Sequence, residues 1–324
     1  MIADRFARRR RVALIRRCLL RGVYCRRRGW YAEGERWARR ADEAAREVDL
    51  AGRATLLVDL ASLWHALTRY PESHACARRA AELLTPSPPG PGRDGPLSDA
   101  LVRMGDVERR QARYVPAEVH LRHAFALAPE TDHERGAAVR LALGVLCKEL
   151  GRYGEAETCY RDALTRLDRL GGEHPMRADA LHNLAGLAHT RGDPGGERYA
   201  RAAIEARRRT LGPRPGPRHD HVAADLAVLG ALLAGQGRHA EAEETLHRAM
   251  DIFRERLGAD HYEVAVCQVN LARLDHLQGR AEQAGRRYRD ALRIKRLTLG
   301  PGHPEVRRLS ALVAEVGDGL AGKG

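Results

Sequence analysis

The sequence is poor in aromatic residues, in lysine and in long apolar runs. Only 15 of its 324 residues are Phe, Trp or Tyr, and lysine occurs three times beside 53 arginines. Aromatic and β-branched side chains favour strands, whereas the alanine and leucine that dominate here favour helices. The composition therefore predicts an all-α fold. The preference for arginine over lysine indicates GC-rich coding, as in an actinobacterial gene.

Other absences exclude whole classes of protein. No run approaches the roughly 20 apolar residues that span a bilayer, and only four apolar residues follow the arginines at 8–11, too few for a signal peptide. We expect no transmembrane segment and a cytoplasmic location. The sequence also lacks a phosphate-binding loop, an HExxH motif and a GxSxG motif. We therefore expect no catalytic residues, no enzymatic activity and no cofactor.

Metal and disulfide chemistry is not indicated either. The six cysteines form no CxxC pair and show no zinc spacing (Cys18, Cys25, Cys76, Cys147, Cys159 and Cys267). HLRH at 120–123 and HDH at 219–221 each offer two metal ligands, but no convergent cysteine or carboxylate set accompanies them. The cysteines and the three tryptophans fall at core positions of the expected helices. We expect reduced cysteines, buried tryptophans and no metal site.

A repeat with a period of about 42 residues organises most of the chain. Similar phrases place histidines at 133, 174, 219, 261 and 303, and each of the first four is followed 18 residues later by a glycine. Between histidine and glycine, apolar or small residues lie three and four apart, as on one face of a helix. A second helical pattern follows the glycine, most clearly at 237–253. Each unit is thus predicted to be a helix, a turn, a second helix and a linker.

Two stretches carry a family resemblance. LGVLCKELGRYGEAETCYRDAL at 143–164 and LGALLAGQGRHAEAEETLHRAM at 229–250 resemble the tetratricopeptide repeat. The longer period, the LG..H linkers and LHNLA at 181–185 are similar to the kinesin-light-chain type of this repeat. Gly230, Ala242 and Ala249 match the family's small residues where two helices cross closely, as small side chains allow. The resemblance implies an α-solenoid, a right-handed superhelix of about seven helix pairs plus a capping helix.

The phasing divides the chain into successive segments. Residues 1–50 form a basic, degenerate first repeat and 51–84 a second; 85–96 are a Pro/Gly-rich loop; 97–132 form a third repeat; 133–302 contain repeats four to seven; 303–316 form the capping helix; and 317–324 are a disordered tail. The loop contains five prolines, which oppose regular structure.

The repeated histidines are interpreted as structural. A catalytic histidine would be needed once, not in five units at a constant position. The linker glycines, such as Gly258, can adopt the left-handed conformation that ends a helix. Pro175 and Pro304 suit the first helical position, where a missing N–H costs nothing. We therefore expect the histidine in each linker, between the glycine and the start of the next helix, to be a cap or a packing residue.

The resemblance implies that the first helix of each pair lines a concave groove, where a protein or peptide partner lies. Eleven residues on these helices fall off the core stripe: Asp99, Arg103, Asp106, Arg109, Asp179, His182, Asn183, His189, Asn270, Arg273 and His276. Asn183 and Asn270 share one position, and an amide can satisfy both a peptide N–H and a C=O. Between them, Val228 and its alanine neighbours predict a smooth apolar stretch. The alternative is that the polar residues form only a solvated helix face.

The positive charge is concentrated at the start of the chain. Residues 1–40 hold 14 arginines and three acidic residues, while the whole chain has a net charge of +13. The patch consists of Arg8, Arg9, Arg10, Arg11, Arg16, Arg17, Arg26, Arg27 and Arg28. It could dock an acidic protein, nucleic acid or an anionic membrane, or it could reflect GC-rich coding alone.

Two functions from different classes follow from these features. The leading hypothesis is a scaffold or adaptor that binds a protein or peptide in the groove. The alternative is a regulatory or signal-sensing array that contacts nucleic acid or another polyanion through its arginine-rich start. Two observations count against the alternative. The sequence shows no helix-turn-helix pattern before residue 28, and it has few aromatic residues on which bases could stack.

Overall fold

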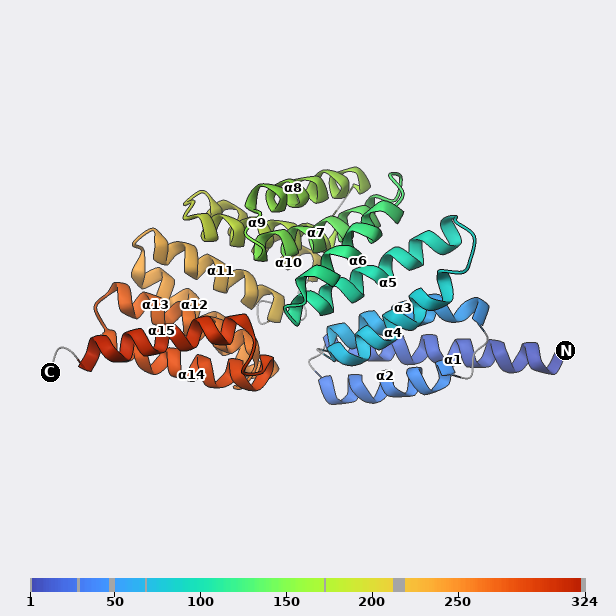
Figure 1. Cartoon of the computed structure of the whole chain (residues 1–324), viewed down its shortest axis with the longest axis horizontal. Coiled ribbons are helices and arrows are strands. Elements are labelled where there is room, and N and C mark those ends of the chain that lie inside the picture. Colours follow the sequence, from blue (N-terminus) through green and yellow to red (C-terminus); the bar gives the residue numbers. More distant parts are fainter. Residues whose placement is uncertain are drawn as a thin grey trace. The chain divides into compact units, whose positions relative to one another are not determined.

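The computed structural model describes residues 2–27, 30–46, 50–67, 69–171, 173–211 and 219–321. For residues 2–9, 27, 50–53, 91 and 316–321 only the backbone is described. Every regular element in these ranges is an α-helix, which confirms the all-α prediction (Figure 1). None of the described helices is both long and apolar enough to cross a membrane.

The helices divide into two compact units, Met1–Leu170 (unit 1) and Gly171–Gly324 (unit 2). Unit 1 contains α1 (Ile2–Arg27), α2 (Tyr31–Arg46), α3 (Leu50–Ala66), α4 (Tyr70–Leu84), α5 (Pro91–Arg110), α6 (Tyr114–Leu127), α7 (His133–Glu149) and α8 (Tyr153–Leu170). Unit 2 contains α9 (Pro175–Arg191), α10 (Gly196–Leu211), α11 (Asp220–Gly235), α12 (His239–Leu257), α13 (Tyr262–Leu277), α14 (Ala281–Leu299) and α15 (Pro304–Ala321). Each unit is a stack of helix pairs, so the chain is an α-solenoid.

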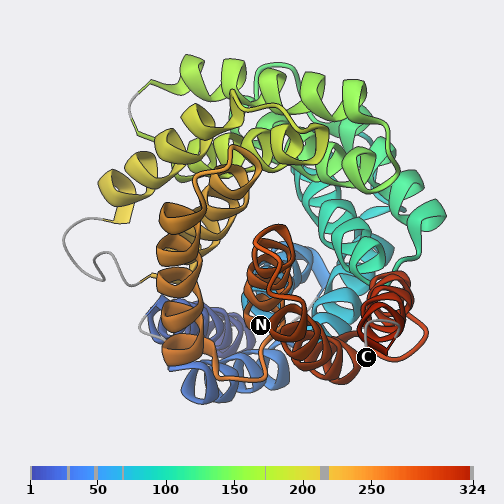
Figure 2. The same cartoon turned by 90° about the vertical axis from the view of Figure 1, so that its left-hand side faces the viewer.

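The contacts between helices define an inner and an outer layer within each unit. Every odd-numbered helix from α1 to α13 packs against the even-numbered helix that follows it, and each pair packs on the next within its unit. Odd-numbered helices of successive pairs also contact one another, as α3 contacts α5 and α11 contacts α13. No comparable contact joins successive even-numbered helices of the described chain. The first helix of each pair therefore lies on the inner side of each stack, as unit 2 shows in Figure 2.

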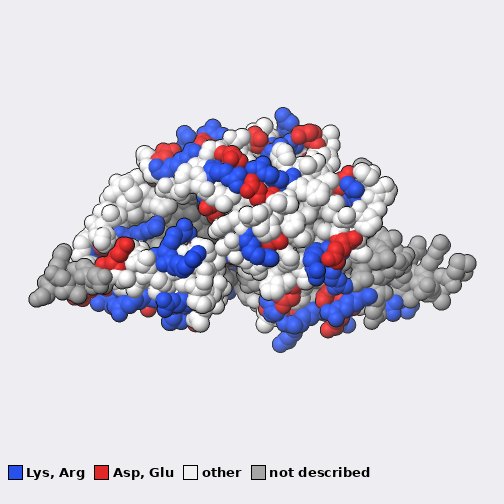
Figure 3. Space-filling model, in the orientation of Figure 1, with Lys and Arg blue, Asp and Glu red and all other residues white. Residues whose placement is uncertain are grey.

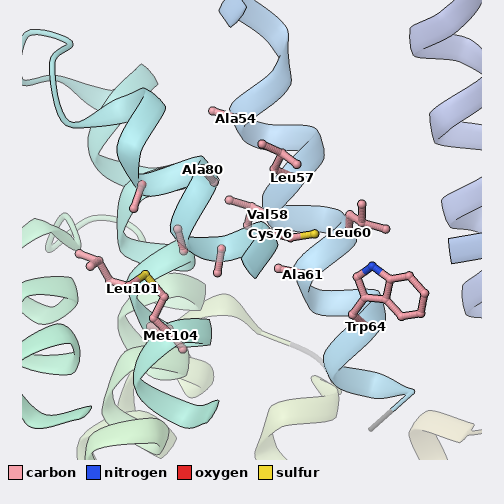
Figure 4. Packing of buried hydrophobic residues seen from close by; sticks show 14 of the residues in the cluster. Ala54, Leu57, Val58, Leu60, Ala61, Trp64, Cys76, Ala80, Leu101 and Met104 are labelled. Atoms are coloured by element: carbon pink, nitrogen blue, oxygen red, sulfur yellow. The ribbon is translucent and has the colours of Figure 1, made fainter. Parts of the chain in front are cut away.

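The core of each unit runs continuously through its stack. In unit 1, Leu57 and Trp64 of α3 and Cys76 of α4 belong to one cluster of buried residues that reaches α5 and α7 (Figure 4). A second cluster in unit 2 extends from α9 to α15. Five cysteines are buried, Cys159 is half-buried, and all six are free. The cysteines and Trp64 are thus core residues, as predicted.

Small residues sit where paired helices approach most closely. Ala242 and Ala249 of α12 are both fully buried. A Cβ atom on Gly230 of α11 would lie 2.6 Å from Cγ of Leu246, so only glycine fits at this position without a shift of α12. The close crossing expected from the repeat pattern is confirmed here.

Two expected segment boundaries are wrong. The Pro/Gly-rich loop ends earlier than residue 96, because α5 begins at Pro91. Pro91 lies in the first turn, where a missing N–H is tolerated, and the Asp94 carboxylate accepts a 2.9 Å hydrogen bond from the Gly90 N–H. At the other end, α15 continues to Ala321, past the expected end at 316. The rest of the expected tail, 322–324, lies outside the described residues.

Trp30 departs from the expected core. Its side chain is 54% exposed and precedes the first residue of α2. It packs edge-on against Tyr24 of α1, with 6.1 Å between ring centroids. The helical phase was compatible with a core position, but no described element packs over this part of the first pair.

Candidate functional site

The inner layer of each unit presents one surface, the first-helix face, formed by α3, α5 and α7 in unit 1 and by α9, α11 and α13 in unit 2. All eleven predicted groove residues lie on α5, α9 or α13. The residues of α5 belong to unit 1, and those of α9 and α13 belong to unit 2. Each face is therefore considered separately.

A partly buried ionic cluster joins three first helices of unit 1. The Asp106 carboxylate of α5 lies 2.5 Å from Nε2 of His65 on α3 and 2.6 Å from Nη2 of Arg109. Arg109 also donates from Nη1 to Glu149 of α7 at 2.5 Å. Burial alone would raise the pKa of Asp106, but Arg109, Arg110 and His65 hold it well below its usual value. Burial lowers the pKa of His65 although Asp106 opposes that shift, so burial favours the neutral form of the ring.

A second cluster, the Asp225 cluster, joins α9, α10 and α11 of unit 2. The Asp225 side chain is fully buried and accepts a 2.6 Å hydrogen bond from Nε of Arg207. Nδ1 of His182 lies 2.8 Å from the other oxygen of this carboxylate. Arg207 also donates from Nη2 to Asp179 at 2.9 Å. Two of the predicted groove residues, Asp179 and His182, therefore also hold neighbouring helices together.

The predicted groove residues differ in whether their side chains already have hydrogen-bond or ion-pair partners within the chain. Asp99 accepts from Nε of Arg135 at 2.9 Å, so its charge is neutralised within the chain. Arg273 and His276 are exposed on α13, and the hydroxyl of Tyr288 on α14 interacts with Arg273. His189 is half-buried on α9.

Arg103 and the two asparagines differ from this bonded group. Arg103, Asn183 and Asn270 are half-buried and have no side-chain hydrogen bond or ion pair to any described residue. Between the asparagines, Val228 and Ala224 of α11 are half-buried. The smooth apolar stretch of groove expected there stays a prediction.

Four of the five repeated histidines cap helices. His174, His219, His261 and His303 each accept, at Nδ1, a hydrogen bond of 3.2 or 3.3 Å from the backbone N–H two residues later. This contact satisfies an N–H that has no acceptor inside the helix. The prediction that these residues are structural caps is confirmed for the four.

His133 does not follow this pattern, so the equivalence of all five histidines is wrong. The cap of α7 is Asp132, whose carboxylate accepts from the Arg135 N–H at 3.0 Å. Asp132 carries an oxygen acceptor at the capping position itself and displaces the histidine into the first turn of the helix. Nδ1 of His133 is buried without a hydrogen-bond partner.

Among the described residues, one group of side chains has a spacing compatible with a metal ion. The ligand atoms of His219, Asp220 and His221 lie within 4.8 Å of one another. Nδ1 of His219 already accepts a 3.2 Å hydrogen bond from the backbone N–H of His221, and this contact caps α11. A metal ion at that atom would compete with the helix cap, so the geometry favours the structural role.

The helix pairs also match a known repeat in sequence. A family profile described as the tetratricopeptide repeat matches residues 97–169 and 220–297. These two stretches are therefore similar to the tetratricopeptide repeat. A comparison with curated proteins gives no match.

Three solved structures have a similar fold. Aspartyl phosphate phosphatase F from Bacillus subtilis superposes with a TM-score of 0.67 at 14% identity, over 92% of this chain and 74% of that one. A Rap protein complexed with competence and sporulation factor gives 0.63 at 14% identity, over 93% and 87%. BtubC (BKLC) from P. vanneervenii gives 0.53 at 23% identity, over 72% and 94%. At these identities the likeness concerns the fold alone.

Sequence reasoning missed the partners that complete the two ionic clusters. His65, Glu149, Arg207 and Asp225 were not among the candidates, because their roles depend on contacts between different repeats. One signal was available for Asp225, which is a lone acidic residue within the otherwise apolar stretch VAADLAVLGALLAG of a tetratricopeptide-repeat helix. A buried acid at such a position needs a cationic or hydrogen-bonding partner.

The basic patch is described only in part. The side chains of Arg8, Arg9, Arg27 and Arg28 lie outside the described residues. Of the others, Arg10, Arg11, Arg16 and Arg17 are exposed on α1 and Arg26 is half-buried. The same helix exposes apolar side chains, with Leu20 72% and Tyr24 50% exposed. Elsewhere among the described residues, basic and acidic side chains are intermixed on the face shown in Figure 3.

Proposed function

We propose that this protein is a non-enzymatic scaffold that binds a protein or peptide along the first-helix face of unit 2. Tetratricopeptide repeats form protein-interaction scaffolds in which a stack of helix pairs offers one extended surface. A similarly folded Rap protein was solved in complex with competence and sporulation factor, which is consistent with ligand binding by this architecture.

The two asparagines carry the proposal. Asn183 and Asn270 are the only asparagines among the 324 residues, and both lie nine residues before the turn glycine of their repeat, Gly192 and Gly279. They occupy α9 and α13, and neither amide has a hydrogen-bond partner among the described residues. A side-chain amide can donate to a peptide carbonyl and accept from a peptide N–H. These two groups are suited to hold a partner's backbone.

The surface between the asparagines suits the side chains of such a partner. Val228 and Ala224 of α11 provide a small apolar contact area between α9 and α13. Asp179 is held by Arg207 and His182 by Asp225, so their positions are set before a partner arrives. Preformed side chains lose less conformational entropy on binding.

A photo-cross-linking residue at Val228 tests the location. Introduced into the full chain in cells that naturally express it, the residue should capture a partner whose contact peptide can be identified by mass spectrometry. The affinity of the purified partner is then compared between the wild type and the variants Asn183→Ala and Asn270→Ala. Each variant should lose on the order of tenfold in affinity, because a pair of hydrogen bonds is lost.

A matched variant controls for the loss of an amide in general. Gln283 lies on the outer helix α14, so Gln283→Ala should leave the affinity unchanged. Equal binding by wild type, Asn183→Ala and Asn270→Ala would contradict the proposed contact. Cross-linking from α14 but not from Val228 would place the partner on the other face.

The absence of catalysis in the proposal has its own test. One similarly folded protein is described as an aspartyl phosphate phosphatase. We expect this chain to leave acetyl phosphate and phosphorylated aspartate at their uncatalysed rates of hydrolysis. A rate increase that depends on Asp106 or Asp225 and survives purification to homogeneity would contradict a purely binding role.

A second candidate function concerns the basic patch. The described part of α1 combines the exposed arginines 10, 11, 16 and 17 with the exposed side chains of Leu20 and Tyr24. A cationic surface with apolar contacts can hold an acidic protein or another polyanion. We propose it as a secondary, salt-sensitive contact that acts independently of the first-helix face.

A further inference from the structure

The last described helix exposes a surface that is covered in the earlier repeats. Leu271 and Ala272 of α13 are 1% and 0% exposed, and α13 packs against α14, the second helix of its pair. The equivalent residues of α15, 42 positions later, are Val313, which is half-buried, and Ala314, which is exposed. Among the described residues, no second helix packs against this side of α15.

The uncovered side of α15 forms a groove with α14, the neighbouring helices at the left of Figure 1. The groove has a volume of about 660 Å³, and its apolar floor includes Leu292 and Leu297 of α14 and Val313 of α15. Leu297 is 69% exposed. The walls are held in place by Lys295 of α14, which donates to Glu305 of α15 at 2.5 Å. We call this surface the C-terminal groove.

The edge of the C-terminal groove is positively charged. Arg289, Arg293 and Arg296 line it, and no acidic residue does. Arg293 forms an exposed ion pair with Asp260 at 2.7 Å, whereas Arg296 donates to the hydroxyl of Ser310. Within the described part of the chain, neither Arg289 nor Arg296 has a carboxylate within ion-pair distance. The surface thus combines an apolar floor with two uncompensated arginines.

We propose that the C-terminal groove binds an amphipathic, acidic helix of a partner protein, which packs on α15 as a second helix packs on the first helix of a repeat. The second helices of the seven preceding pairs are 14 to 19 residues long, which sets the length of helix that the register can accept. An apolar stripe on the partner would cover Leu297 and Val313. Acidic residues on its flank would face Arg289 and Arg296.

The charge of the groove argues for a separate acidic partner over a second copy of this chain. Two described helices each expose three large apolar side chains: α1 exposes Leu20, Val23 and Tyr24, and α6 exposes Val115, Val119 and Phe125. α1 also carries Arg10 and Arg11, so its approach would bring arginines against arginines. The one acidic residue of α6, Glu118, is already paired with Arg122 and Arg152. An acidic helix would meet the opposite charge.

The probe for the test is a 19-residue peptide that copies α12, His239–Leu257, labelled with fluorescein. This sequence already packs as a second helix through Ala242, Leu246 and Ala249, and it contains five acidic and three arginine residues. Fluorescence anisotropy measures its binding to the full chain. A control peptide replaces Glu241, Glu243 and Glu244 with lysine.

Groove variants decide where the probe binds. Leu297→Glu and the double change Arg289→Glu with Arg296→Glu should each weaken binding at least tenfold, and the lysine peptide should bind at least tenfold more weakly than the acidic one. Val115→Glu, at a 78% exposed position of α6, is the matched control and should not change the affinity. Because Leu297 is exposed, its variant should fold; Ala314→Glu provides a second groove variant with the same expected loss.

Several outcomes would overturn the proposal. These are the absence of saturable binding, equal binding to the wild type and to Leu297→Glu, and equal affinity for the acidic and lysine peptides. Analytical ultracentrifugation provides a further check. Dimerisation that is abolished by Leu297→Glu would show that a second copy of the chain, not an acidic partner, covers the groove. Circular dichroism of each variant must retain the helical signal of the wild type.

Discussion

His182 and Asp225 connect two successive helix pairs through a single hydrogen bond, with 2.8 Å between Nδ1 of the ring and Oδ1 of the carboxylate. The second carboxylate oxygen of Asp225 accepts from Arg207. The buried carboxylate of Asp225 on α11 is therefore hydrogen-bonded to one side chain from α9 and to one from α10. The surface that presents Asn183 depends on this junction, because His182 is its immediate neighbour.

Removing the Asp225 carboxylate alone should destabilise the protein more than replacing both Asp225 and Arg207 with apolar residues. Asp225→Ala leaves the Arg207 guanidinium, 9% exposed, beside a cavity and paired only with Asp179. A buried charge that loses its partner typically costs about 3–5 kcal/mol. We expect a loss of that order in urea unfolding of Asp225→Ala. The double variant Asp225→Leu with Arg207→Met should recover much of it, and two equally destabilised proteins would contradict this account.

The tightness of the helix crossing predicts a contrast between two substitutions. Ala249 is fully buried between paired helices, so Ala249→Arg must bury an unpaired charge or separate the helices. We expect a loss of about 3 kcal/mol or more. His261→Ala removes one cap, the 3.3 Å contact with the Glu263 N–H, and should cost about 1 kcal/mol. If the two variants lowered the melting temperature by similar amounts, the assignment of residues to positions in the repeat would be wrong.

The turn of the third repeat contains an avoidable strain. Ala112 has φ = 56°, while Gly151, at the corresponding turn of the next repeat, has φ = 76°. A left-handed conformation costs a non-glycine residue roughly 1–2 kcal/mol. Ala112→Gly should therefore stabilise the protein by up to about 1 kcal/mol, after the greater entropy of glycine in the unfolded chain is subtracted. Gly151→Ala is the reciprocal test and should destabilise it.

Two histidines should make stability depend on pH in a defined direction. Burial lowers the pKa of both His65 and His261. Each binds fewer protons in the folded chain than in the unfolded chain, so its stabilising effect is complete above the unfolded pKa of about 6.5 and declines as the pH falls below it. The melting temperature should drop from pH 7.5 to pH 5.5.

A double variant isolates these two groups from the remaining histidines. In His65→Gln with His261→Asn, the glutamine can still donate to Asp106, and asparagine is a good helix cap that does not titrate. Its melting temperature should decline less over the same pH interval. Parallel curves for the wild type and the variant would exclude His65 and His261 as the source.

The basic patch should bind polyanions without sequence preference. We expect weak association with heparin and with DNA of any sequence, lost by about 0.2 M salt because exposed charges are screened. Changing Arg8–Arg11 to glutamate should abolish it, whereas partner binding that depends on Asn183 should persist. DNA binding that is sequence-specific and survives 0.2 M salt would instead support the nucleic-acid function.

The repeat architecture was readable from the sequence because it depends on local spacing. The recurrence of turn glycines such as Gly151 and Gly237, with small residues such as Ala249 at fixed distances from them, specifies helix lengths and close crossings before any long-range contact is known. The histidine caps were predictable for a similar reason, since a cap such as His261 bonds only two residues ahead. Where a better cap stood next to the histidine, as Asp132 does, the repeat pattern alone was misleading.

The tertiary structure decided which of the polar residues remain available to a partner. Asp106, Arg109, Asp179 and His182 lie on first helices, as the asparagines do, but they have partners on other helices, 43 residues away in the case of Asp225. Helical periodicity gives the direction of a side chain and not the charge of the group that faces it. Only the stacking of one helix pair on the next brings His65 to Asp106 and Arg207 to Asp225. No short-range sequence pattern indicates that these residues of different helices will meet.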